Sequence, residues 1–371
     1  MAGLNDIDIK VADVKLAYLQ APCREKVWTI ANEAFFDEEG TFFKIVRALY
    51  GLSSSGAAFG SFMANMLDEL NFKPSIADPD VWLRCGIRPG STERYYEHVL
   101  VYVDDIMVLS AMASLVMEAL QKKLTFKNGE ASDPDIYLGA KIAKKKHEEG
   151  ECWSMSSSHY LKAAIETVEE KLAKEGKKLP SNCRTPCSSS FCPELDRSME
   201  LGEDGAHYFR ELIGMLRWAT ELGRVDILTE VSVLSQHQAA PRQGHLEEVL
   251  HIFGYLKKVG KLTLHFNPRM PYWPDTTNQT KCNSEDFLEH YRDAEEVLPP
   301  DAPVPLGKPV DLTAYVDASH AANKVTRRSH IGYILFVQSC CDNESVHPKH
   351  SARRSDCGPT VIIVVTAKVT H

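Results

Sequence analysis

The sequence predicts an α+β protein whose first part follows the order β-α-β-β-α-β. Apolar and polar side chains alternate over residues 7–13, as in a strand with one buried face. Residues 98–110 contain two apolar runs separated by a pair of aspartates, which is typical of a hairpin. Residues 53–72 and 111–124 repeat apolar side chains at helical spacing. Further strands are predicted at 77–84 and 135–144.

The rest of the chain differs in pattern. A helix over 159–175 carries one apolar stripe and ends before Gly176, a residue that often terminates helices. Residues 206–260 look all-helical and contain three such segments, and two strands follow a segment rich in Pro, Asp and Asn. We therefore expect four parts: an αβ unit at 1–150, a helical unit at 151–266, a linker at 267–310 and a partial αβ domain at 311–371.

Bulk properties exclude several classes of protein. The 371 residues, 44% hydrophobic and 25% charged, are typical of a soluble protein of two or three domains. No apolar run is long enough to cross a membrane, and no secretory signal opens the chain, so a cytoplasmic or nuclear location is expected. The net charge of −9 is unlike that of a strong nucleic-acid binder, and the ten cysteines lack zinc-site spacing.

Three carboxylates occupy unexpected positions. Asp104 and Asp105 form the joint of the predicted hairpin, where Asp-Asp is a poor choice because two-residue turns favour Asn-Gly or Asp-Gly. A simple turn role is the competing interpretation, since Asp is common in turns. Asp13, however, continues the buried face of the first strand, where an unpaired charge is costly. A divalent cation would stabilise all three, and we expect Asp13 and Asp104 to bridge two Mg²⁺ or Mn²⁺ ions, with Asp105 contributing less.

Ordered motifs then carry a specific resemblance. The segments "ADVKLAYLQAP", "RALYGLSSSGAAF", "IADPDVW", "YVDD" and "YLGAKI" are similar in order and spacing to the reverse transcriptase of copia-like LTR retrotransposons. Downstream segments such as "YFRELIGMLRWATELG" and "YVDASHAANKVTRRSHIGYILF" resemble the same polyprotein continuing into ribonuclease H. The resemblance implies a ferredoxin-like polymerase palm, a helical thumb and connection, and a truncated ribonuclease H-like domain.

The resemblance also implies roles for individual residues. It makes Asp13, Asp104 and Asp105 the catalytic carboxylates of RNA-directed DNA polymerisation, acting on an RNA or DNA template-primer and dNTPs. The other matched positions are the nucleotide-binding residues Tyr18, Tyr50, Gly51 and Leu52, the primer grip Tyr137, Leu138 and Gly139, and the ribonuclease H carboxylate Asp317. For Tyr18, a core aromatic at the start of a helix is nearly as good an interpretation.

The match departs from the family pattern in ways that lower the expected activity. Ser53 stands where the family has Lys, and the cationic fingers region that holds the triphosphate has no counterpart in this sequence. The pattern also stops after about Asn343, and no further ribonuclease H carboxylates follow. We therefore predict weak or no polymerase activity and no ribonuclease H activity, and we hypothesise that the tail is read from a shifted frame.

Two alternatives stay open at this stage. The chain could be a non-catalytic retroelement remnant, which shares every motif with an active enzyme. It could also be a template-independent nucleotidyl cyclase on the same palm. That class is expected to have a Gly-rich turn before its carboxylates, where this chain has Tyr102 and Val103.

Overall fold

The computed structural model describes residues 1–34, 40–147, 150–266, 300, 302–306, 310–339 and 362–368. The chain divides into two compact units. The first comprises Met1–Pro134 with Tyr272–Lys308, and the second comprises Asp135–Pro271 with Pro309–His371. Most of the predicted linker, and the part of the tail before residue 362, lie outside the described residues.

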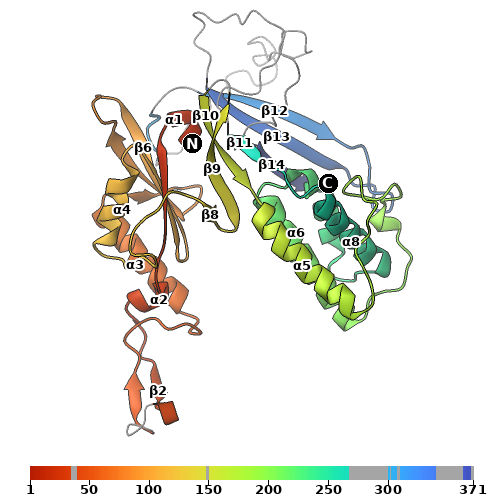
Figure 1. The fold of residues 1–371 in the computed structure, drawn as a ribbon, viewed down its shortest axis with the longest axis horizontal. Coiled ribbons are helices and arrows are strands. Elements are labelled where there is room, and N and C mark those ends of the chain that lie inside the picture. The colour runs from red at the N-terminus through yellow and green to blue at the C-terminus, as the bar shows by residue number, and fades with distance from the viewer. Residues whose placement is uncertain are drawn as a thin grey trace, which may run out of the picture. The chain divides into compact units, whose positions relative to one another are not determined.

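The first unit is built on a five-stranded antiparallel sheet in the order β1-β7-β6-β5-β4. Its strands are β1 (Asp8–Asp13), β4 (Lys73–Pro74), β5 (Val81–Ile87), β6 (Arg94–Tyr102) and β7 (Asp105–Ser110). Its helices are α1 (Ala2–Asn5), α2 (Ala17–Gln20), α3 (Ser55–Glu69) and α4 (Ala113–Gln121). A separate hairpin pairs β2 (Trp28–Ile30) with β3 (Phe42–Lys44), and Figure 1 shows it beyond α2.

Helices α3 and α4 share one core with the sheet. The predicted helices at 53–72 and 111–124 are confirmed, and their apolar residues are buried at the expected spacing. The core includes Phe59 and Met63 from α3, Val116 and Leu120 from α4, and Val99, Ile106 and Val108 from β6 and β7. This packing fixes the β6–β7 hairpin on a rigid base, because side chains on both strands are locked against the helices.

The predicted alternation over residues 7–13 is confirmed as far as Val11, since Ile9 and Val11 are buried and Asp8 is exposed, but Ala12 is buried on the other face as well. Ala12 and Val14 belong to the core shared with the helices, while Ile9 and Val11, on the opposite face, are also buried. Asp13 shares this second face, because side chains alternate along a strand. Its side chain is 34% exposed, so the expected burial of Asp13 is only partial.

The predicted closing strand of the first unit was also wrong. A turn at Leu138 and Gly139 divides residues 135–144 into β8 (Ile136–Tyr137) and β9 (Ala140–His147), which belong to another sheet. Both turn residues have positive φ, 51° and 88°, as in a type I′ hairpin. The edge of β1 is instead met by two isolated bridges, Val11 with Ser132 and Val14 with Phe126. The α+β class holds, but the ferredoxin-like order of strands is incomplete.

The second unit combines helices with two sheets. A four-stranded sheet has the order β11-β10-β9-β8, with β10 at Gly150–Ser156 and β11 at Leu264–Phe266. The helices are α5 (Ser158–Lys174), α6 (Glu203–Glu221), α7 (Leu228–Leu234) and α8 (Gln243–Lys258), with short 3₁₀ turns at Pro193–Leu195, Val225–Ile227 and Ser235–His237. These helices bury a second apolar core, so the predicted helical segments 159–175 and 206–260 are confirmed.

The end of α5 follows the prediction in detail. Gly176 has φ 70°, and the amide of Lys177 donates to the carbonyl of Leu172 over 2.9 Å. Together with the bond from the Gly176 amide to the carbonyl of Ala173, this is a Schellman motif.

A three-stranded antiparallel sheet contains β12 (Val310–Ala318), β13 (His330–Ser339) and β14 (Ile362–Lys368), in that order. The two strands predicted after the linker are confirmed as β12 and β13, whereas β14 was not predicted. Within the described ranges, none of the helices combines the length and apolar character that a bilayer crossing demands.

Candidate active site

Backbone pairing brings the three predicted catalytic aspartates together in the first unit. Asp13, the last residue of β1, is the direct partner of Asp105, the first residue of β7. Asp104 precedes Asp105 in the turn, and its carbonyl accepts a 2.7 Å hydrogen bond from the amide of Val14. The β1–β7 ladder therefore places all three residues at one end of the sheet, although Asp13 is distant from the pair in sequence.

The turn that carries Asp104 is strained. Tyr102 pairs with Asp105, so Val103 and Asp104 are the two central residues of the hairpin turn. Val103 has φ 51°, while Asp104 is not among the residues with positive φ, which is the pattern of a type II′ turn. Glycine normally fills that first position, because a branched side chain there clashes with the backbone at a cost of about 1–2 kcal/mol. Such strain is common at functional sites.

The three carboxylates influence one another electrostatically. The pKa of Asp105 is raised above its ordinary value, first by burial and then by the negative charges of Asp104 and Asp13. The positive charge of Lys127 acts in the opposite direction. The ionised form of Asp105 is thus disfavoured, and a cation bound beside it would favour that form.

Lys127 is the residue that sequence reasoning missed. Its ammonium lies 2.9 Å from the Oδ2 atom of Asp13, and its backbone amide donates to the carbonyl of Asp13 over 2.8 Å. The hydrogen bond and charge of Asp13 raise the pKa of Lys127, and burial is too slight to reverse the effect. No local pattern around Lys127 marks it, because its position depends on the segment after α4 running beside β1.

The donor set suits a divalent metal by its chemistry. Carboxylate oxygens are the ligands that Mg²⁺ and Mn²⁺ prefer, and the β1–β7 pairing places three aspartates at one end of the sheet. In the part of the chain that the structure describes, however, no three acidic, histidine or cysteine side chains already form a metal-binding cluster. Asp13 is engaged by Lys127 instead. An ion bound by Asp13 would compete with this ion pair.

Two of the predicted nucleotide-binding residues are brought into contact. The rings of Tyr18, in α2, and Tyr50, before α3, have centroids 4.8 Å apart. Tyr18 also meets Phe59 edge-on at 6.1 Å, whereas Tyr50 is 54% exposed. Gly51 has φ 96°, which places a left-handed turn directly before Leu52. Tyr18 thus combines a core contact on one side with an exposed aromatic partner on the other.

The other predicted site residues lie in the second unit. Tyr137 ends β8, and Leu138 and Gly139 form the turn that leads into β9. Asp317 is exposed on β12, opposite Gly332 of β13. They do not share a compact unit with Asp13, Asp104 and Asp105.

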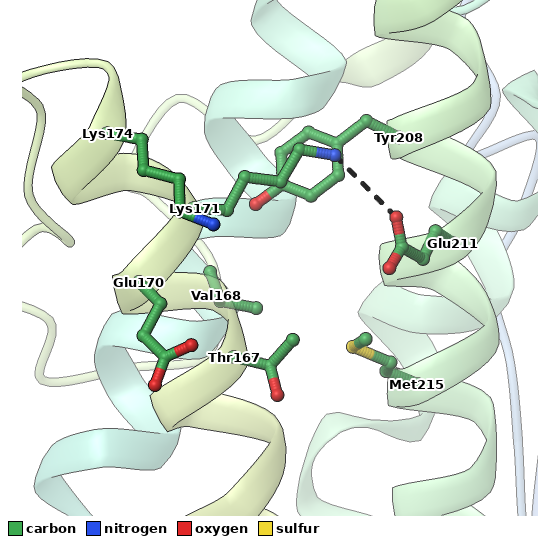
Figure 2. A pocket seen from close by; sticks show the side chains of 8 residues that line it. All are labelled: Thr167, Val168, Glu170, Lys171, Lys174, Tyr208, Glu211 and Met215. Carbon is green, nitrogen blue, oxygen red and sulfur yellow. Dashed lines mark ion pairs between the residues drawn. The ribbon is translucent and has the colours of Figure 1, made fainter.

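A cavity of about 360 Å³ lies between α5 and α6 of the second unit (Figure 2). The ammonium of Lys171 stands 3.5 Å from the centre of the Tyr208 ring and 3.7 Å from the Oε2 atom of Glu211. The buried Tyr208 hydroxyl makes no hydrogen bond to any described residue, and burial raises the pKa of Tyr208 to about 12. None of the predicted site residues lines this cavity.

Comparisons with known proteins agree with the resemblance. Residues 1–180 match the family described as reverse transcriptase (RNA-dependent DNA polymerase). The chain is 24% identical over 303 residues to the retrovirus-related Pol polyprotein from transposon TNT 1-94 of Nicotiana tabacum, a match covering 80% of this chain and 21% of that protein. It is 26% identical over 275 residues to the Pol polyprotein from transposon RE1 of Arabidopsis thaliana, covering 69% of this chain and 17% of that protein.

A third relative is about as long as this chain. The putative transposon Ty5-1 protein of Saccharomyces cerevisiae is 22% identical over 329 residues, and the match covers 88% of both chains. By contrast, this chain spans about a fifth of the two plant polyproteins. Residues 1–180 are a reverse transcriptase domain of the kind found in the Pol polyproteins of copia-like retrotransposons.

Proposed function

We propose that this domain carries out RNA-directed DNA synthesis by two-metal nucleotidyl transfer, with Asp13, Asp104 and Asp105 as its catalytic carboxylates. The observation that supports this most directly is the β1–β7 register, which sets Asp13 opposite Asp105 with Asp104 beside it. In this proposal Asp13 and Asp104 hold both Mg²⁺ or Mn²⁺ ions, and Asp105 contributes less. Bound ions would activate the primer 3′-hydroxyl and stabilise the leaving pyrophosphate.

The aromatic pair supports a nucleotide site beside the carboxylates. We assign Tyr18 to packing beneath the sugar of the incoming dNTP, because its ring is held from the core side by Phe59. The exposed ring of Tyr50 and the turn at Gly51 and Leu52 are assigned to nucleotide and template contacts. Positive φ at Gly51 suits close approach of a ligand to the backbone, since no side chain intervenes.

The remaining assignments belong to the same proposal. Residues 1–150 are the palm, 151–266 the thumb and connection, 267–310 a linker and 311–371 a ribonuclease H remnant that includes Asp317. The turn of Tyr137, Leu138 and Gly139 contacts the primer. The partners are an RNA or DNA template-primer and dNTPs, and the expected location is the cytoplasm or nucleus.

We expect slow turnover. Ser53 supplies no charge where the family pattern has Lys, and Lys127 engages Asp13. Both features weaken positioning and charge neutralisation, which supply most of the catalysis in phosphoryl transfer.

The test is single-nucleotide extension of a labelled primer on an RNA template with Mn²⁺ or Mg²⁺. Asp104→Asn should abolish extension, and Asp80→Asn should not. Asp80 is exposed in the same unit and lies outside the proposed site, so this variant is the matched control. Extension equal in the wild type and Asp104→Asn would leave the non-catalytic remnant as the better interpretation.

A further inference from the structure

We propose that Lys127 serves as the counter-ion of Asp13 in the metal-free protein, so that a divalent ion enters the site only by displacing the lysine ammonium. This inference rests on the proposed function, because it takes Asp13 to be a metal ligand. It assigns to Lys127 a role in controlling metal affinity.

The backbone of Lys127 is fixed at the site. Its amide bonds to the carbonyl of Asp13, and the amide of Lys15 donates to the carbonyl of Thr125 over 2.9 Å. The side chain of Gln20 bonds both backbone groups of Thr125, at 2.9 and 3.0 Å. These contacts anchor the segment that carries Lys127 along β1, next to the carboxylates.

The side chain of Lys127, in contrast, can leave the site. It is 65% exposed, and Asp13 is the sole ion-pair partner that the described residues give it. An exposed ion pair of this kind is weak, because water and salt screen it. Lys127 can therefore turn outward without loss of its backbone anchors.

Charge favours the exchange once a divalent ion is present. Lys127 brings one positive charge to a site with three carboxylates, Asp13, Asp104 and Asp105. Each divalent ion brings twice that charge and accepts several oxygen ligands at once, whereas an ammonium makes single hydrogen bonds. The lysine thus limits repulsion without the ion and competes with the ion for Asp13.

The test is the affinity of the full chain for Mn²⁺, measured from the electron paramagnetic resonance signal of the free ion. Lys127→Met should bind Mn²⁺ roughly two- to fivefold more tightly than the wild type, which corresponds to loss of a weak ion pair. Lys127→Arg keeps the charge and should bind as the wild type does. Asp13→Asn should lose at least about tenfold in affinity, as expected for loss of a ligand.

A matched control separates this effect from a general change in charge. Lys123→Met removes a positive charge in the same segment, where Lys123 pairs with Glu69, and should leave Mn²⁺ affinity unchanged. Equal affinities of the wild type and Lys127→Met, with weaker binding by Asp13→Asn, would overturn the role of Lys127 and leave the polymerase proposal standing. Absence of Mn²⁺ binding by every form would overturn both.

Discussion

Asp13 and Asp105 are direct partners in the β1–β7 ladder, each at the end of its strand nearest the Asp104 turn. Like charges placed opposite each other destabilise a sheet. The pair is therefore retained at a cost in stability, unlike the apolar pairs Val11–Met107 and Ala12–Ile106 that precede it. This cost is what a site designed for cations is expected to carry.

Asp105→Asn should stabilise the first unit at pH 7 by roughly 0.2–1 kcal/mol, because it removes one member of the like-charge pair. The pKa of Asp105 is raised in the folded protein, so the unfolded chain releases this proton at lower pH. The contribution of Asp105 to the free energy of unfolding therefore falls as pH rises from its ordinary pKa of 3.8 to its raised pKa in the folded protein.

The gain from Asp105→Asn should consequently shrink toward the acid end of that window, where Asp105 is protonated. Urea unfolding of the wild type and the variant at several pH values measures the difference. Asp80→Asn is the control for a simple change in net charge. A variant less stable than the wild type at pH 7 would contradict the electrostatic account.

Val103→Gly should relieve the strain in the turn. Removing the side chain at φ 51° recovers about 1–2 kcal/mol, and the greater entropy of unfolded glycine takes back about 0.5–1 kcal/mol. A net gain of up to about 1 kcal/mol is expected in urea unfolding. Val101→Gly, in β6 of the same hairpin and without positive φ, should instead destabilise the protein. Destabilisation by Val103→Gly would show that the turn is not strained.

Tyr208→Phe and Tyr255→Phe make a matched pair in the helical unit. The Tyr208 hydroxyl is buried without a hydrogen bond to a described residue, whereas that of Tyr255 donates to Asp226 over 2.9 Å. Tyr208→Phe should be neutral or stabilising, and Tyr255→Phe should cost about 1.5–3 kcal/mol because it removes a bond to a charged group. Thermal or urea unfolding distinguishes them, and equal losses would mean that the Tyr208 hydroxyl has a partner.

Local patterns were sufficient for the longer helices and for some of the strands. Helices α3, α5, α6, α7 and α8 lie largely within the predicted segments 53–72, 159–175 and 206–260, where apolar side chains repeat every three or four positions. The hairpin around Asp104 and Asp105 was evident from two strand-forming runs separated by charges. The reverse transcriptase resemblance followed from short motifs in order, and the family match to residues 1–180 agrees with it.

Such local patterns did not predict which residues other than glycine have positive φ. Leu138 and Val103 both adopt left-handed backbone conformations that their side chains disfavour. Gly139 is a turn signal that the prediction of one strand over 135–144 did not use. The turn predicted at Asp104 and Asp105 lies one residue earlier, at Val103 and Asp104. Tertiary pairing on both sides imposes these conformations.

The sequence by itself determined which residues could act: three aspartates at strand ends and two tyrosines in separate motifs. Only the tertiary structure decided which of them meet. The β1–β7 register sets Asp13 against Asp105, the packing of α2 and α3 brings Tyr18 to Tyr50, and the segment after α4 carries Lys127 to Asp13. These relationships join residues far apart in the chain. They are established by long-range packing and strand pairing, which local periodicity does not encode.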